Sequence, residues 1–115
     1  MNHEPLASIE HEVLGWPGVW KNRDENGPGG VGVTGYRLGR RQIGHVHDDG
    51  HADLRVPREV RDGLIRSGRA VLHPAFPESR TTASYRIRGP EDVPGAIELF
   101  RMSYERQRAR EGRHG

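Results

Sequence analysis

The chain has 115 residues, with 18 Lys or Arg and 16 Asp or Glu, so its formal net charge at pH 7 is only +2. It contains no cysteine, which excludes disulfides, thiolate catalysis and cysteine-ligated zinc or iron–sulfur sites. It has neither an apolar run of the roughly 18 residues that a membrane span needs nor an apolar signal segment at its start. We therefore expect a cytoplasmic protein of one domain, with no membrane partner.

The apolar content is low. Val, Ile, Leu and Phe make up about a fifth of the residues, near the level at which chains become disordered. The small net charge and the periodic apolar blocks favour folding all the same. Lys21 is the only lysine among the basic residues, and acidic residues are interspersed with the arginines. Because no basic stripe is evident before the C-terminal tail, we expect no nucleic-acid partner.

Apolar periodicity and turn residues divide the chain into elements. In chain order we predict a helix over 5–14, a polar Gly-rich loop over 21–30, strands over 31–38, 41–47 and 52–56, a helix from Pro57 to Ser67-Gly68, an irregular link over 69–80, a strand over 81–88 and a helix that begins at 89–92. A change of apolar parity predicts a bulge near Thr34-Gly35. Trp16 and Trp20 are expected to cap the core.

The C-terminal helix carries the clearest periodicity in the chain. Its apolar residues recur at spacings of four, three and four: Val93, Ile97, Phe100 and Tyr104. Residues 106–115 are rich in arginine and are expected to form a flexible tail, which leaves a domain over 1–105. The order α-β-β-β-α-β-α predicts an α+β fold with a small antiparallel sheet of about four strands and helices on one face.

Histidines concentrate in one predicted strand and the turn after it. His45 and His47 are two residues apart, so on a strand they share a face, together with Ile43, and with Arg41 if no bulge intervenes. Histidine titrates near neutral pH, so such a pair could move protons or hold a metal. His73 precedes a proline, which favours an extended backbone and could aim this side chain at the same sheet.

Three interpretations of these histidines stay open. The imidazoles could act as general base and hydrogen-bond donor toward an organic substrate. They could instead bind zinc, iron, nickel or copper with a carboxylate from Asp48, Asp49 or Asp53. They could also be hydrogen-bonded sheet residues without a chemical role. The other histidines are expected to lie in solvent or to be incidental: His51, His3, His11 and His114.

One segment resembles a known family. The sequence from Arg41 to Asp48, Arg-Gln-Ile-Gly-His-Val-His-Asp, is followed by a strand, a helix and a later His73-Pro74. This order is similar to that in the luciferase domain of bioluminescent fungi and its bacterial relatives. The resemblance spans about residues 39–105 and includes an aromatic residue near the end of the closing helix, Tyr104. Gln42 stands where the family usually has an acidic residue.

The resemblance implies an oxidoreductase. Fungal members oxidise a hydroxylated pyrone with molecular oxygen, release carbon dioxide and light, and use no flavin or nucleotide. Carried over by position, it implies catalytic roles for Arg41, His45, His47 and His73, a small-molecule substrate, and no cofactor unless the three histidines hold a metal. A module that binds a small acid or a partner protein without catalysis stays open as the alternative.

Overall fold

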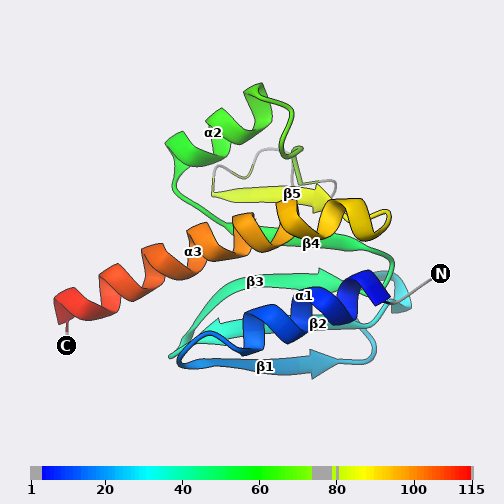
Figure 1. The fold of residues 1–115 in the computed structure, drawn as a ribbon, viewed down its shortest axis with the longest axis horizontal. Helices are drawn as coiled ribbons and strands as arrows, with labels where there is room; N and C mark the ends of the chain where they lie inside the picture. The colour runs from blue at the N-terminus through cyan, green and yellow to red at the C-terminus, as the bar shows by residue number, and fades with distance from the viewer. Residues whose placement is uncertain (1–3, 74–78, 80, 115) are drawn as a thin grey trace.

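The structure is a computed structural model that describes residues 4–73, 79 and 81–114 (Figure 1). Its elements, in chain order, are α1 (Glu4–Leu14), β1 (Val19–Asp24), the 3-10 turn η1 (Pro28–Gly30), β2 (Val33–Leu38), β3 (Arg41–His47), β4 (His51–Arg55), α2 (Arg58–Arg66), β5 (Thr82–Arg86), the 3-10 turn η2 (Pro90–Asp92) and α3 (Val93–His114). The five strands lie side by side in chain order, and every neighbouring pair is antiparallel. The predicted α+β fold is therefore confirmed.

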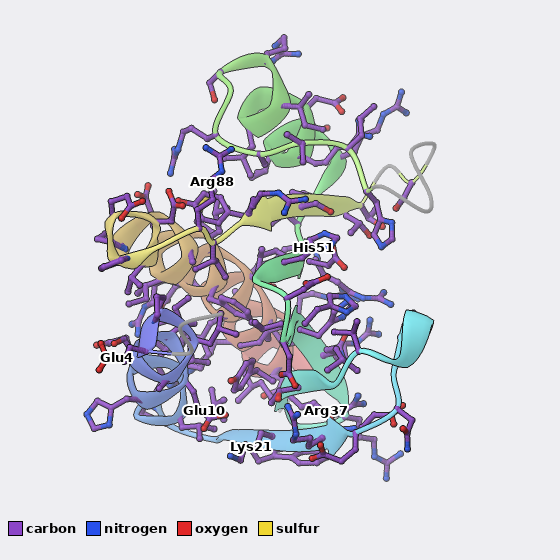
Figure 2. The ribbon with its side chains drawn as sticks, turned by 90° about the vertical axis from the view of Figure 1, so that its right-hand side faces the viewer. Glu4, Glu10, Lys21, Arg37, His51 and Arg88 are labelled. Carbon is purple, nitrogen blue, oxygen red and sulfur yellow. The ribbon has the colours of Figure 1, made fainter. Side chains whose placement is uncertain are left out.

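Helices α1 and α3 cover one face of the sheet, and the core lies between them and the strands (Figures 1 and 2). Helix α1, predicted over 5–14, buries Ile9 and Val13, which are four residues apart on one face. The stripe of α3 buries Phe100, whose ring meets Tyr36 edge-on with centroids 5.6 Å apart. Helix α2 packs beside β5 at the edge of the sheet rather than with the other two.

The sheet has one strand more than predicted. β1 pairs with β2 along its whole length, from Val19 opposite Leu38 to Asp24 opposite Val33. Its residues after Val19 are all exposed, so this edge strand shows no apolar alternation, and its charged residues are typical of a protected sheet edge. Trp16 is buried as expected, whereas Trp20 is exposed and stacks with Arg37. The expectation that Trp20 caps the core is therefore wrong.

The bulge lies in β3 rather than near Thr34-Gly35. Tyr36 pairs with Gly44 and Arg37 with Gln42, which leaves Ile43 without a partner on β2. This extra residue reverses the face of the sheet on which the preceding side chains of β3 lie, and Ile43 is buried in the core. The prediction that Ile43 points the same way as His45 is therefore wrong.

Helix α3 extends further than expected. It continues to His114, whereas the sequence suggested a flexible tail after residue 105. The reason lies in the composition of residues 105–111, in which Arg, Glu, Gln and Ala are all good helix formers, and Gln107 is buried. None of the helices in the described parts of the chain combines the length and the apolar character that a membrane crossing requires.

Candidate functional site

A buried carboxylate, Asp53, occupies the face of the sheet opposite α1 and α3. Asp53 pairs with His45 of β3 on one side and with Ser84 of β5 on the other, so the three side chains lie next to one another. Its side chain is 2% exposed, and the Ser84 hydroxyl donates a hydrogen bond to Oδ1 at 2.5 Å. Asp53 alternates along β4 with the core residues Ala52 and Leu54, so it points away from the core, and its neighbours, rather than solvent, surround it.

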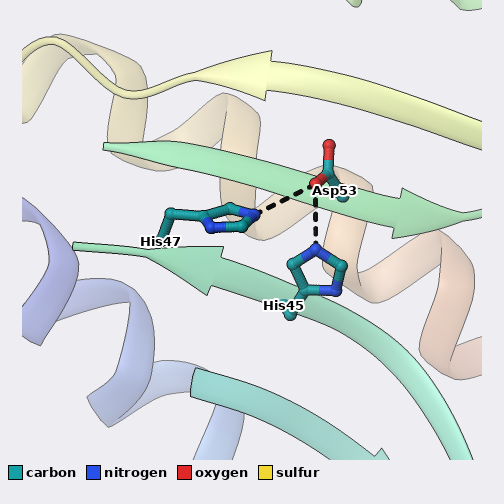
Figure 3. A group of neighbouring side chains, drawn as sticks. All are labelled: His45, His47 and Asp53. Carbon is teal, nitrogen blue, oxygen red and sulfur yellow. Dashed lines mark hydrogen bonds and ion pairs between the residues drawn. The ribbon is translucent and has the colours of Figure 1, made fainter. Parts of the chain in front are cut away.

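Those neighbours are four imidazoles, which together with Asp53 we call the histidine–aspartate cluster. Their Nε2 atoms lie 2.9 Å (His45), 3.3 Å (His47) and 3.4 Å (His73) from Asp53 Oδ2, and 2.9 Å (His51) from Oδ1. Figure 3 shows His45 and His47 converging on Asp53 from the neighbouring strand. The predicted meeting of His45, His47 and His73 is thus found in the structure.

His51 is a member of the cluster that the sequence analysis missed. It lies opposite His47 across the hairpin, the two rings stack with centroids 5.1 Å apart, and the expectation of a solvated side chain is wrong. Asp48-Asp49-Gly50 joins β3 to β4, and a three-residue turn between paired strands places residues 47 and 51 opposite each other. This spacing is the sequence signal that places His51 beside His47.

The cluster shifts the protonation equilibria of its members. Burial opposes ionisation of Asp53, but the hydrogen bonds from His45 and Ser84 and the close approach of His51 outweigh it and lower the pKa of this carboxyl. Burial and the neighbouring His45 lower the pKa of His47, whereas the Asp53 carboxylate raises the pKa of His51. The carboxylate therefore stays ionised, and two adjacent imidazoles are driven toward opposite charge states.

His45 engages a partner at each ring nitrogen. Its Nε2 contacts Asp53, and its Nδ1 lies 3.0 Å from Oε1 of Gln42. An imidazolium donates to both oxygens, whereas a neutral ring needs the Gln42 amide to turn over and donate through its nitrogen. Both arrangements are compatible with an amide, so Gln42 lets His45 gain or lose a proton without losing its hydrogen bonds.

A pocket of about 230 Å³ opens beside the cluster. It is lined by Gln42, His45, Asp53, Leu54, Arg55, His73, Ser79 and Thr82. His45 and His73 thus share one cavity, whereas His47, which was expected to share it, is not among the residues that line it. Arg41 does not join them, because the bulge in β3 reverses its side, and it lines a second pocket instead.

The other sequence candidates lie elsewhere. Asp48 forms an ion pair with Arg23 at 2.7 Å and Asp49 is exposed, so Asp53 is the carboxylate that the histidines share. His11 is exposed on α1. His3 lies outside the described residues, and the side chain of His114 is not described.

These features define a class of protein: a small α+β domain with a histidine–aspartate cluster on the face of an antiparallel sheet opposite α1 and α3. Comparison with known families matches residues 40–103 to the luciferase domain, and the chain belongs to this family. The matched segment runs from the bulged strand β3 into α3 and includes every member of the cluster. No curated protein and no solved structure matches the chain.

The raised pKa of His51 predicts a pH-dependent contribution to stability. A group whose pKa is higher in the folded state stabilises the fold fully below its ordinary pKa of about 6.5, and this contribution disappears as the pH rises through the folded value. The loss of unfolding free energy caused by His51→Gln, measured with urea, should therefore be larger at pH 5 than at pH 9. The exposed His11→Gln should change little at either pH, and an equal loss at both values for His51→Gln would contradict the assignment.

Proposed function

We propose that the domain is a small-molecule oxidoreductase in which the histidine–aspartate cluster removes a proton from an acidic enol or phenol. The observation that carries the proposal is the convergence of four imidazoles on one buried carboxylate at the wall of a pocket. The resulting anion transfers an electron to O₂, and the two radicals combine to form a C–O bond. The substrate is the only reductant, so this first step needs no further cofactor.

The geometry supports roles for four members of the cluster. His45 and His73 line the pocket, so they are in position to contact a substrate, with His45 as the base. Asp53 orients the ring of His45 and stabilises the imidazolium that forms when the base accepts a proton. His47 has a lowered pKa and therefore stays neutral at pH 7, which keeps a second proton acceptor beside the same carboxylate.

Oxygen uptake tests this proposal. We expect the protein to consume O₂ when a hydroxylated 2-pyrone or a catechol is added, and His45→Gln to lower the rate by about 100-fold or more, as for loss of a general base. His11→Gln is the matched control, because it removes an exposed imidazole of another element. Unchanged uptake in a folded His45→Gln variant would remove His45 from the mechanism.

Metal binding is a second candidate, and the crowding around Asp53 favours it. Three imidazole nitrogens approach Oδ2, although a carboxylate oxygen offers only about two lone-pair directions. Nε2 of His51 is buried 2.9 Å from Oδ1 but lies outside hydrogen-bond geometry. Separations of about 3 Å are also those between neighbouring ligands of an ion with bonds of about 2.0–2.2 Å. The ligand atoms of His45, His47 and Asp53 all lie within 4.8 Å of one another.

Metal titration tests the second candidate. Protein without a polyhistidine tag, dialysed against a chelator, should bind about one Zn²⁺, Co²⁺, Ni²⁺ or Cu²⁺ per chain, since imidazole with carboxylate suits these ions. Binding should weaken at least tenfold in His47→Gln and stay unchanged in His11→Gln. Absence of stoichiometric binding would overturn the metal site. If the chelated protein still consumes O₂, proton transfer alone accounts for the activity.

A further inference from the structure

A second and larger pocket lies where the C-terminal half of α3 passes the turn between β2 and β3. Its volume is about 470 Å³, and its walls carry six arginines: Arg37, Arg40, Arg41, Arg55, Arg106 and Arg110. We call it the arginine pocket. These side chains come from β2, the turn, β3, β4 and α3, so the fold gathers them from distant parts of the chain. None of the described residues that line the pocket is acidic.

The charges in this pocket are not neutralised by the described part of the protein. None of the six guanidinium groups lies within 4.0 Å of a described carboxylate, whereas Arg23, Arg69 and Arg101 each pair with an acid elsewhere. The carboxylate of Glu111 occupies the space that a Cβ at Gly39 of the turn would need, and Glu111 is not part of the lining. Burial chiefly, and then repulsion from Arg110 and Arg41, lower the pKa of Arg106.

We propose that the arginine pocket binds a small molecule that carries at least two negative charges on oxyanion groups, either a phosphoryl group or a pair of carboxylates. Guanidinium groups recognise such anions through paired hydrogen bonds in a fixed plane, which a flexible lysine cannot reproduce. The concave shape and the net charge of only +2 favour a small anion over a nucleic acid, which needs an extended basic surface. A bound anion also relieves the repulsion among the arginines.

The two pockets adjoin. Gln42 and Arg55 line both of them, so a ligand held by its anionic group in the arginine pocket extends toward His45 and His73. In this arrangement the substrate of the histidine–aspartate cluster carries the anionic group, and this assignment rests on the proposed function. Binding of the anion itself does not depend on that function, and the experiment separates the two.

The test is calorimetric titration of the full chain at low salt with inorganic phosphate, pyrophosphate and malonate. Saturable binding of one anion per chain is expected, and Arg41→Gln and Arg106→Gln should each weaken it at least about tenfold, as for loss of a charge-assisted hydrogen-bonded pair. Arg66→Gln is the matched control, because Arg66 is exposed at the end of α2 and does not line the pocket. Preference for pyrophosphate or for malonate identifies the phosphoryl or the carboxylate source.

A second measurement guards against variants that simply lose their fold. In the absence of anion, Arg106→Gln should have a Tm equal to or above that of the unmodified protein, because the substitution removes repulsion. Pyrophosphate should raise the Tm of the unmodified protein and of His45→Gln, but not that of Arg106→Gln. The response of His45→Gln keeps anion binding distinguishable from the proposed chemistry.

Three results would overturn the proposal. The first is no saturable binding of any of the three anions. The second is an equal loss of binding in Arg66→Gln, which would indicate a general effect of net charge. The third is tighter binding of a single-stranded oligonucleotide than of pyrophosphate, which would make the pocket part of a nucleic-acid surface.

Discussion

Asp53→Asn should lower the free energy of unfolding by about 3–5 kcal/mol, the range for removing one partner of a buried charged group. The carboxylate accepts from Ser84 and from the surrounding imidazoles. An asparagine keeps the shape but replaces one acceptor oxygen with an amino group, which directs a donor at other donors. Urea unfolding at pH 7 measures the loss, and the exposed Asp49→Asn should stay within about 0.5 kcal/mol of the unmodified protein.

The same variant has a pH signature. Because the pKa of Asp53 is lowered in the folded state, its contribution is complete above the ordinary value of about 4 and is lost as the pH falls further toward the folded value. The difference in unfolding free energy between the unmodified protein and Asp53→Asn should therefore shrink below pH 4. A difference below about 1 kcal/mol at pH 7 would show that Asp53 is not the charged centre of the cluster.

The helices and the central strands were predictable because the apolar residues that recur with helical or strand periodicity are the ones that the core buries. Ile9 and Val13 of α1 and Phe100 and Tyr104 of the α3 stripe are buried, and Ala52 and Leu54 are buried at alternate positions of β4. β1 was not predictable on the same grounds. As an edge strand exposed along nearly its whole length, it has no buried face from which an alternation could arise.

The site was predictable as far as residue spacing determines it. His45 and His47 share a face whatever their partner strands do, and His73 follows α2 in an extended link. The bulge at Ile43 depends on how β3 pairs with β2, and it moves Arg41 from the cluster to the arginine pocket. The central place of Asp53 depends on its register with both β3 and β5, which no local pattern specifies.

Phe100→Ala should have a comparably large effect, about 3–5 kcal/mol of unfolding free energy, as for other buried aromatic truncations. The ring is fully buried between Tyr36 and the backbone of β3, so its removal leaves a cavity under the strand that carries the cluster. Urea unfolding measures the loss. Leu72→Ala, at a side chain that is 44% exposed, should change stability by less than about 0.5 kcal/mol.

A double-mutant cycle with Gly44 shows whether α3 holds β3 through this contact. A Cβ at Gly44 would lie 2.7 Å from Cε1 of Phe100 and 2.7 Å from Cδ1 of Leu54, so Gly44→Ala alone should cost about 1–3 kcal/mol. In the Phe100→Ala background the first of these clashes is gone, and the substitution should cost at least about 0.5 kcal/mol less, as for residues in contact. Additive losses would mean that Leu54, rather than Phe100, excludes a side chain at this position. Gly44 directly precedes His45. A smaller cost of Gly44→Ala in the Phe100→Ala background would therefore show that the packing of α3 against the core face of β3 supports the cluster.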